Sequence, residues 1–105
     1  MKFVIRPAAR EDILRQYQYY LIEADELVAA RFLNAVEFTI AKLCRQPGIG
    51  VPKALRNLRL AGLRSSAVRG FSSIRVYYLV SEQTVRVVRV LHGKRDIDPV
   101  LEANE

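Results

Sequence analysis

The segment FSSIRVYYLVSEQTVRVVRVL, residues 71–91, decides the fold. Two runs rich in β-branched and aromatic residues flank its polar tetrapeptide, residues 81–84. Such runs around a short polar link are typical of two antiparallel strands joined by a turn. We therefore expect a β-hairpin made of the strands Phe71–Val80 and Val85–Leu91, with the residues that flank the turn paired to each other.

This register assigns each side chain of the hairpin to one face of the sheet, because successive residues of a strand point to opposite sides. One face is apolar apart from its arginine and should cover the helices; it carries Ile74, Val76, Tyr78, Val80, Val85, Val87, Arg89 and Leu91. The other face mixes arginine with aromatic and aliphatic side chains, as protein interfaces do; it carries Arg75, Tyr77, Leu79, Arg86, Val88 and Val90. We interpret the second face as a binding surface, with a plain solvent-exposed face as the alternative. A register error of one residue would exchange the two faces.

The chain before the hairpin predicts helices and one more strand on each side of them. Lys2–Arg6 alternates as a short strand, and Pro7 suits the first position of a helix, where its missing N–H costs nothing. Asp25 is a suitable N-cap for a second helix, which Pro47-Gly48-Ile49-Gly50 ends. A further strand is expected at Leu63–Val68.

Each helix should bury an apolar stripe with three- and four-residue spacing. The stripe of the first helix comprises Ile13, Leu14, Tyr17, Leu21 and Ala24, and that of the second comprises Ala29, Phe32, Leu33, Val36, Ile40 and Leu43. We expect an α+β fold, in which an N-terminal strand and an antiparallel helical hairpin pack on a small antiparallel sheet, followed by a short C-terminal segment.

The composition fits a single domain, residues 1–105, with 50% hydrophobic residues. No stretch approaches the ~20 apolar residues of a membrane span, and the N-terminus is too soon interrupted by charge to act as a signal peptide. We therefore expect a cytoplasmic protein. The single cysteine, Cys44, cannot form an internal disulfide, and with one histidine the chain has no Cys/His ligand set. We expect no metal and no cofactor.

The net charge of +6 belongs to the second half of the chain. Residues 1–52 hold seven Lys/Arg and six Asp/Glu, whereas residues 53–95 hold ten Lys/Arg and a single acidic residue, Glu82. So uneven a distribution predicts an acidic partner, either a nucleic acid or an acidic protein segment. A merely solubilising surface is the alternative.

Five groups of motifs, in order along the chain, resemble the ParE branch of the ParE/RelE toxin superfamily. They are RPAARED (6–12), ARFL with QPGIG (30–33 and 46–50), GLRS (62–65), RGF (69–71) and VRVLHGKRD (88–96). The last is the sharpest match, and together they cover nearly the whole chain. The resemblance implies a compact helical hairpin against a small antiparallel sheet.

The same resemblance implies the toxin of a type II toxin–antitoxin pair, with DNA gyrase as the target and inhibition by binding. It also implies a cognate antitoxin whose C-terminal part wraps the toxin in a hetero-oligomer; from the basic charge we expect that segment to be acidic or amphipathic. The residues expected to bind the antitoxin or the target are Arg64, Arg75, Tyr77, Leu79, Arg86, Val88, Arg89 and Arg95.

RelE-like relatives cleave messenger RNA on the ribosome, and this activity is the alternative. Arg75 and Arg95 match arginines of the RelE-like pattern, and His92 is the only histidine. Metal-free RNA cleavage also needs a proton acceptor and a proton donor. The RelE-like pattern has a tyrosine in the C-terminal helix, but residues 97–105 contain none.

A His/Glu pair would be another route to proton transfer. Glu82 lies ten residues from His92 along one strand, a separation of about 33 Å. Glu102 and Asp96 could approach His92, but nothing in the sequence requires it. We interpret His92-Gly93 as structural, with Gly93 supplying a positive φ, and expect a toxin without hydrolytic activity. A third hypothesis is a binding module that has lost its toxicity.

Overall fold

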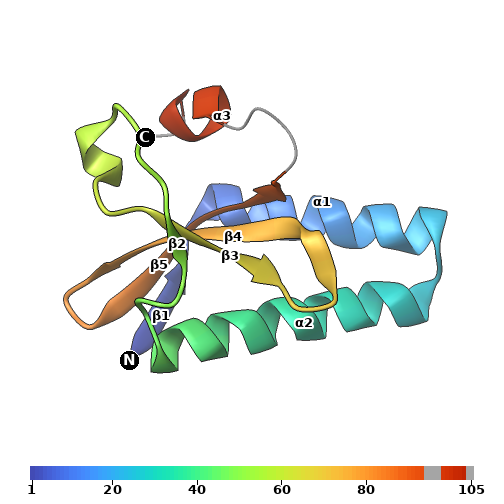
Figure 1. Cartoon of the computed structure of the whole chain (residues 1–105). Helices are drawn as coiled ribbons and strands as arrows, with labels where there is room; N and C mark the ends of the chain where they lie inside the picture. The colour runs from blue at the N-terminus through green and yellow to red at the C-terminus, as the bar shows by residue number, and fades with distance from the viewer. Residues whose placement is uncertain (94–97, 104–105) are drawn as a thin grey trace.

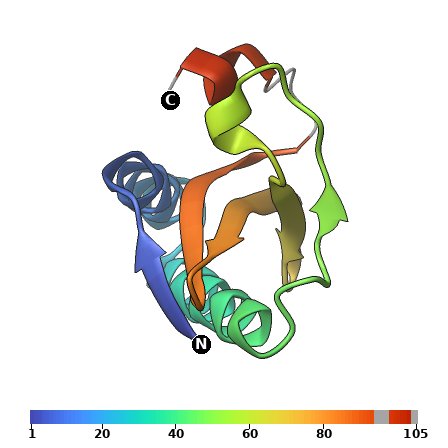
Figure 2. The ribbon, with the colours of Figure 1, turned by 90° about the vertical axis from the view of Figure 1, so that its left-hand side faces the viewer.

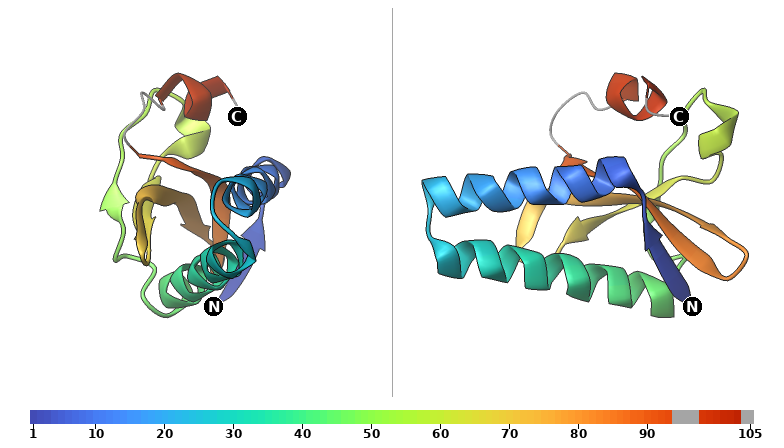
Figure 3. Two further views of the ribbon diagram at one scale, coloured as in Figure 1. Left: turned by 90° about the vertical axis from the view of Figure 1, so that its right-hand side faces the viewer. Right: turned by 180° about the vertical axis from the view of Figure 1, so that it is seen from behind.

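The computed structural model describes residues 1–93 and 98–103 (Figure 1). The elements are β1 (Lys2–Ile5), α1 (Pro7–Glu23), α2 (Glu26–Arg45), β2 (Val51–Pro52), the 3₁₀ helix η1 (Leu58–Leu60), β3 (Arg64–Val68), β4 (Phe71–Ser81), β5 (Thr84–His92) and α3 (Asp98–Ala103). The long helices α1 and α2 run side by side in opposite directions (Figure 3). The expected α+β fold is confirmed. Within the described residues, no helix has the length and apolar character that crossing a membrane requires.

The five strands form one sheet in the order β1-β5-β4-β3-β2. The central hairpin has the expected register beside its turn, with Val80 opposite Val85. Its two turn residues, Glu82 and Gln83, have φ values of 52° and 62°, the left-handed conformation that two-residue hairpin turns need. The sheet is mixed rather than antiparallel, because β1 pairs in parallel with β5. A four-residue strand carries no pattern that identifies its neighbour, so the sequence could not reveal this pairing.

The ends of the helices follow the expected local chemistry. Pro7 occupies the first turn of α1, and the Asp25 side chain accepts a hydrogen bond of 2.9 Å from the Val28 N–H at the start of α2. Lys42 and Arg45 lie in the last turn of α2, where cations favour the negative end of the helix dipole. Local sequence therefore determines where both helices begin and where α2 ends.

The main core lies between the helices and the sheet. The stripe of α2 is buried at Ala29, Phe32, Val36, Ile40 and Leu43, and its Leu33 is half-buried. The stripe of α1 is much less covered than expected. Leu14 is 53% exposed, whereas Ala9 and Asp12 are the buried residues of this helix. The reason is that α1 packs beside α2 and against β5, so it buries only a narrow face.

A β-bulge at Val88 changes the predicted faces of β5. Tyr78 pairs with Val87, but Tyr77 pairs with Arg89, so Val88 is an extra residue on its strand. Although Arg89 still reaches Asp12 of α1 on the helical side, a bulge of this kind exchanges the faces of the residues that follow it. As a result Val90 belongs to the core beneath the helices, and Leu91 packs on the far side, which exchanges their predicted positions.

The second face of the sheet is covered, which corrects the prediction of an open binding surface. A second cluster buries Leu60, Leu63, Tyr77, Val88 and Leu101, with Leu55, Leu79 and Leu91 packed against it. The covering residues come from α3 and from the irregular segment before β3, both of which lie on the side of the sheet away from α1 and α2 (Figure 2). That segment has no periodic pattern, so its packing on the sheet was not visible in the sequence.

Candidate binding groove and the anchored arginines

Arg89, predicted as a binding residue, forms a buried ion pair with the first helix. Its Nε donates to Oδ2 of Asp12 at 2.7 Å and its Nη2 donates to Oδ1 at 2.8 Å. The hydrogen bond to Asp12 raises the pKa of Arg89 above its ordinary value, although burial acts in the opposite direction. The side chain faces the helices, as expected. With only 9% of the residue exposed, Arg89 holds α1 on β5 rather than presenting a cation to a partner.

Arg64 anchors the turn that follows α2. Its Nη1 donates to the carbonyl oxygen of Gly50 at 2.7 Å, and the Gly50 N–H donates to the hydroxyl of Tyr78 at 3.0 Å. The same hydroxyl donates to the carbonyl oxygen of Pro47 at 2.7 Å. Burial raises the pKa of Tyr78, against smaller opposing effects of the Gly50 hydrogen bond and Arg64. Tyr78 is therefore neutral near neutral pH and serves as an internal hydrogen-bonding group.

Arg75 is held in a similar way across the sheet. Its Nε donates to Oγ of Ser65 at 2.9 Å and its Nη2 donates to the carbonyl oxygen of Ser65 at 3.2 Å. The Gly93 N–H donates to the carbonyl oxygen of Ser73 at 2.7 Å, and a Cβ on Gly93 would lie 2.7 Å from Cδ of Arg75. Among the described glycines, Gly62 and Gly70 have a positive φ, whereas Gly93 does not. Gly93 is thus required by the close approach of Arg75, and the expected positive φ was wrong.

The candidates for proton transfer are not brought together in the described residues. His92 is exposed at the end of β5, and Glu82 lies in the turn at the opposite end of that strand. Oε1 of Glu102 accepts a hydrogen bond of 2.7 Å from the Asn57 N–H, so this carboxylate is engaged with the covering segment. Arg95 and Asp96 lie outside the described residues.

The other predicted binding residues differ in accessibility. Tyr77 and Val88 are each 2% exposed beneath α3 and the segment before β3. Leu79 is half-buried at the edge of the same cluster. Arg86 is partly exposed, and its Nε donates to Oγ of Ser81 at 3.2 Å. Of the predicted set, the described residues that reach the surface are Arg64, Arg75, Leu79 and Arg86.

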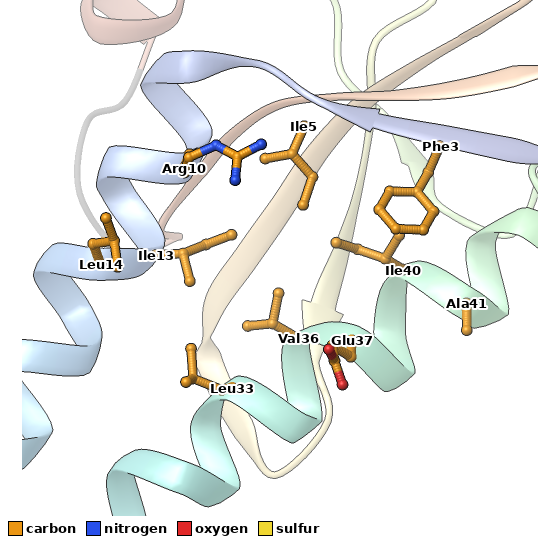
Figure 4. Close-up of a pocket in the computed structure, with 10 residues that line it drawn as sticks. All are labelled: Phe3, Ile5, Arg10, Ile13, Leu14, Leu33, Val36, Glu37, Ile40 and Ala41. Atoms are coloured by element: carbon orange, nitrogen blue, oxygen red, sulfur yellow. The ribbon is translucent and has the colours of Figure 1, made fainter.

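An apolar groove lies on the helical side of the molecule, where the sequence did not predict a site. It has a volume of about 460 Å³ and is formed by β1, α1 and α2. Its lining comprises Phe3, Ile5, Arg10, Ile13, Leu14, Leu33, Val36, Glu37, Ile40 and Ala41 (Figure 4). Phe3 and Leu14 are each 53% exposed. The groove's large apolar helical residues, Ile13, Leu14, Leu33, Val36 and Ile40, belong to the two stripes that were expected to be buried.

In the groove, apolar side chains from three elements converge. Ile13 of α1 points toward Ile5 of β1 and Val36 of α2, while the Phe3 ring lies near Ile40 (Figure 4). The polar lining residues are Arg10 and Glu37, both largely exposed. The arrangement can accept apolar side chains at its floor and charged groups of both signs at its edges.

A sequence comparison assigns the chain to a family. A family model described as the ParE toxin of the type II toxin–antitoxin system parDE matches residues 3–97. The chain belongs to the ParE toxin family. A comparison with curated proteins gives no match.

The fold is also that of a solved ParE-type complex. The chromosomal ParDE toxin–antitoxin system from P. aeruginosa contains a chain with a TM-score of 0.73 and 15% sequence identity, over 88% of this chain and 95% of that one. At this identity the likeness concerns the fold alone.

The motifs that resemble ParE are also the ones that make the anchoring contacts. Asp12, at the end of RPAARED, holds Arg89 of VRVLHGKRD. Gly50, at the end of QPGIG, accepts from Arg64 of GLRS, and Ser65 of the same motif accepts from Arg75. In this chain, the motifs that resemble ParE therefore contain the residues that join distant segments through hydrogen bonds.

Proposed function

We propose that this ParE-family toxin acts by binding, that its target is DNA gyrase, and that a cognate antitoxin neutralises it by placing an amphipathic segment in the α1–α2–β1 groove. The observation that carries the proposal is the groove itself, in which large apolar side chains remain half exposed. An occupant that buried Phe3 and Leu14 would gain about 25 cal/mol per Å² of apolar surface removed from water.

The groove favours an amphipathic segment over a uniformly polar one. Apolar residues of the occupant would pack against Ile13, Val36 and Ile40, and its polar residues would lie toward Arg10 and Glu37 at the edges. This is the general mode in which an amphipathic element lays its apolar face into a groove. The partly exposed arginines Arg64, Arg75 and Arg86, with Arg95 from outside the described residues, would contact acidic residues of the antitoxin or the target, and Leu79 would pack against an apolar one.

Three observations support binding rather than RNA cleavage. Arg75 donates two hydrogen bonds to Ser65, and these bonds hold its guanidinium against the sheet. Glu102 is bonded to Asn57. Burial raises the pKa values of Tyr77 and Tyr78, so neither phenol would act as a base near neutral pH. We further propose that the toxin acts in the cytoplasm, the compartment of its proposed target.

A charge placed in the groove tests the proposal. We expect Leu14→Glu to weaken antitoxin binding by about tenfold or more, because a carboxylate would have to be desolvated against the bound apolar face. Ile22→Glu is the matched control, since Ile22 belongs to the same helix, is 79% exposed and lies outside the groove lining. Titration calorimetry gives the affinities, and circular dichroism shows that both variants fold.

Antitoxin binding by Leu14→Glu that equals that of the parent chain would contradict the assignment of the groove. A second substitution, Phe3→Glu, approaches the same groove from β1 and does not depend on how α1 tolerates the change.

A further inference from the structure

A second cleft lies on the other side of α2, away from the proposed antitoxin groove. It has a volume of about 620 Å³ and is formed by α2 and the turn between β3 and β4. Its lining comprises Val28, Arg31, Asn34, Ala35, Phe38, Arg69, Gly70 and Phe71. None of these residues lines the groove, so α2 presents a different set of side chains to each site.

The floor of the cleft is apolar and well supported. The Phe71 ring packs against the rings of Tyr20 and Phe32, with centroid separations of 5.3 Å and 5.4 Å. Phe38, at the edge of the cleft, is 43% exposed. The floor can therefore take an apolar or aromatic side chain without displacing the core.

Arg69 is held in position at the edge of this floor. Its guanidinium carbon lies 4.6 Å from the centroid of the Phe38 ring, and its backbone N–H donates to Oγ1 of Thr39 at 3.2 Å. Gly70, with a φ of 81°, makes the tight turn that places the arginine there. A guanidinium that lies over an aromatic ring can still donate N–H groups to a carboxylate, which can accept two of them.

The charges around the cleft are unbalanced. Arg31 and Arg69 are both exposed, and the lining contains no carboxylate. Within the part of the chain that the structure describes, neither of these two cations forms an ion pair. Asn34 adds an amide that can donate or accept a hydrogen bond.

We propose that this cleft docks a protein segment that carries an aspartate or glutamate beside an apolar or aromatic side chain. The carboxylate would bind the edge of Arg69, with Arg31 nearby, and the apolar side chain would lie on the floor formed by Phe71 and Ala35. The site is independent of the proposed function, because it shares no residue with the antitoxin groove.

Nucleic acid fits the cleft less well than an acidic protein segment. Single-stranded nucleic acids bind along a row of cations with open aromatic faces for the bases. The cleft offers two arginines, and the guanidinium of Arg69 already covers a face of the Phe38 ring. The charge and the shape of the cleft therefore favour a protein segment with one carboxylate and one apolar side chain over a nucleic acid.

The test uses the full chain labelled with nitrogen-15 and three probes: the N-acetylated peptide Glu-Leu-Glu-Phe, its analogue Gln-Leu-Gln-Phe, and a single-stranded oligothymidylate. We expect the acidic peptide to shift the amide resonances of Asn34, Phe38 and Phe71, and the glutamine analogue to bind about tenfold more weakly or worse, since it lacks the charge-assisted hydrogen bonds. This comparison requires no change in the protein.

Variants locate the interaction. Arg69→Gln should weaken binding of the acidic peptide by about tenfold, whereas Lys42→Gln should leave it unchanged, because Lys42 is an exposed residue of α2 that lines neither site. Equal binding of the two peptides, shifts confined to the groove residues, or tighter binding of the oligothymidylate at these resonances would each overturn the proposal.

Discussion

Asp12 and Arg89, which are 77 residues apart in sequence, form a bidentate ion pair between α1 and β5. Asp12 is 1% exposed, and its Oδ2 also accepts a hydrogen bond of 3.0 Å from the Val90 N–H just after the bulge. The neighbouring Gln16 donates to the Val90 carbonyl oxygen at 2.8 Å. One carboxylate thus fixes the position of the first helix and satisfies the backbone of a strand whose regular pairing is interrupted.

Loss of Asp12 should be severely destabilising. We expect Asp12→Ala to lower the free energy of unfolding by ~3–5 kcal/mol, because it leaves the Arg89 charge buried without its partner. Arg15→Ala is the control: Arg15 approaches Asp12 at 3.6 Å but its side chain is 69% exposed, so its loss should cost ~0–1 kcal/mol. Chemical denaturation measures both values. Similar costs for the two variants would show that the ion pair does not organise the fold.

Gly50 has a packing role that an alanine cannot fulfil. A Cβ at this position would overlap the Tyr78 hydroxyl and lie 2.8 Å from Cε1 of the same ring. We expect Gly50→Ala to cost ~1–3 kcal/mol of stability. Gly48→Ala, in the same turn, has no atom within 4 Å of its added methyl group and should be close to neutral. Thermal melting of the two variants decides the matter, and equal melting temperatures would refute the prediction.

The C-terminal helix should contribute to stability through one side chain. Leu101 is 0% exposed and packs in the second cluster with Tyr77 and Val88. Truncation to alanine should cost ~2–5 kcal/mol, whereas Val100→Ala, at a position that is 38% exposed, should cost much less. If urea unfolding of Leu101→Ala matches that of the parent, α3 does not cover the sheet in solution.

Alkaline pH should weaken the fold through its buried tyrosines. Burial raises the pKa of Tyr78 above its ordinary value of 10.0, so the unfolded chain loses this proton first as the pH rises. The stabilisation from neutral Tyr78 is complete below the unfolded pKa and is lost as the pH rises through the folded pKa. We expect the free energy of unfolding to decline above pH ~10, and to decline less steeply in Tyr78→Phe. Identical slopes for the two proteins would contradict this cause.

The parts of the fold that local chemistry controls could be predicted from the sequence. Pro7 and Asp25 begin the two helices, and the turn at Glu82 and Gln83 sets the pairing of Val80 with Val85. The bulge could not be located in advance, because Val88 is apolar and fits either face. The adjacent valines, Val87 and Val88, interrupt the alternation of the strand, but they do not show which residue is the extra one.

The candidate site was harder to predict than the fold. The basic half of the sequence predicts a binding surface, but Arg89 bonds to Asp12, 77 residues away, and Arg75 bonds to Ser65 on the neighbouring strand. Such partners become apparent only when the chain is folded. The groove depends on the spacing between β1, α1 and α2, which the pattern of any one segment does not contain.

We propose that this ParE-family toxin acts on gyrase by binding and leaves RNA intact. The most direct measurement adds the purified chain to a gyrase supercoiling reaction, while message ends are mapped in parallel on translating ribosomes. We predict that supercoiling is lost and that the messenger RNA stays whole. Unaffected supercoiling, together with position-specific cuts that disappear in Arg75→Ala or His92→Ala, would contradict gyrase binding and show that the toxin cleaves RNA.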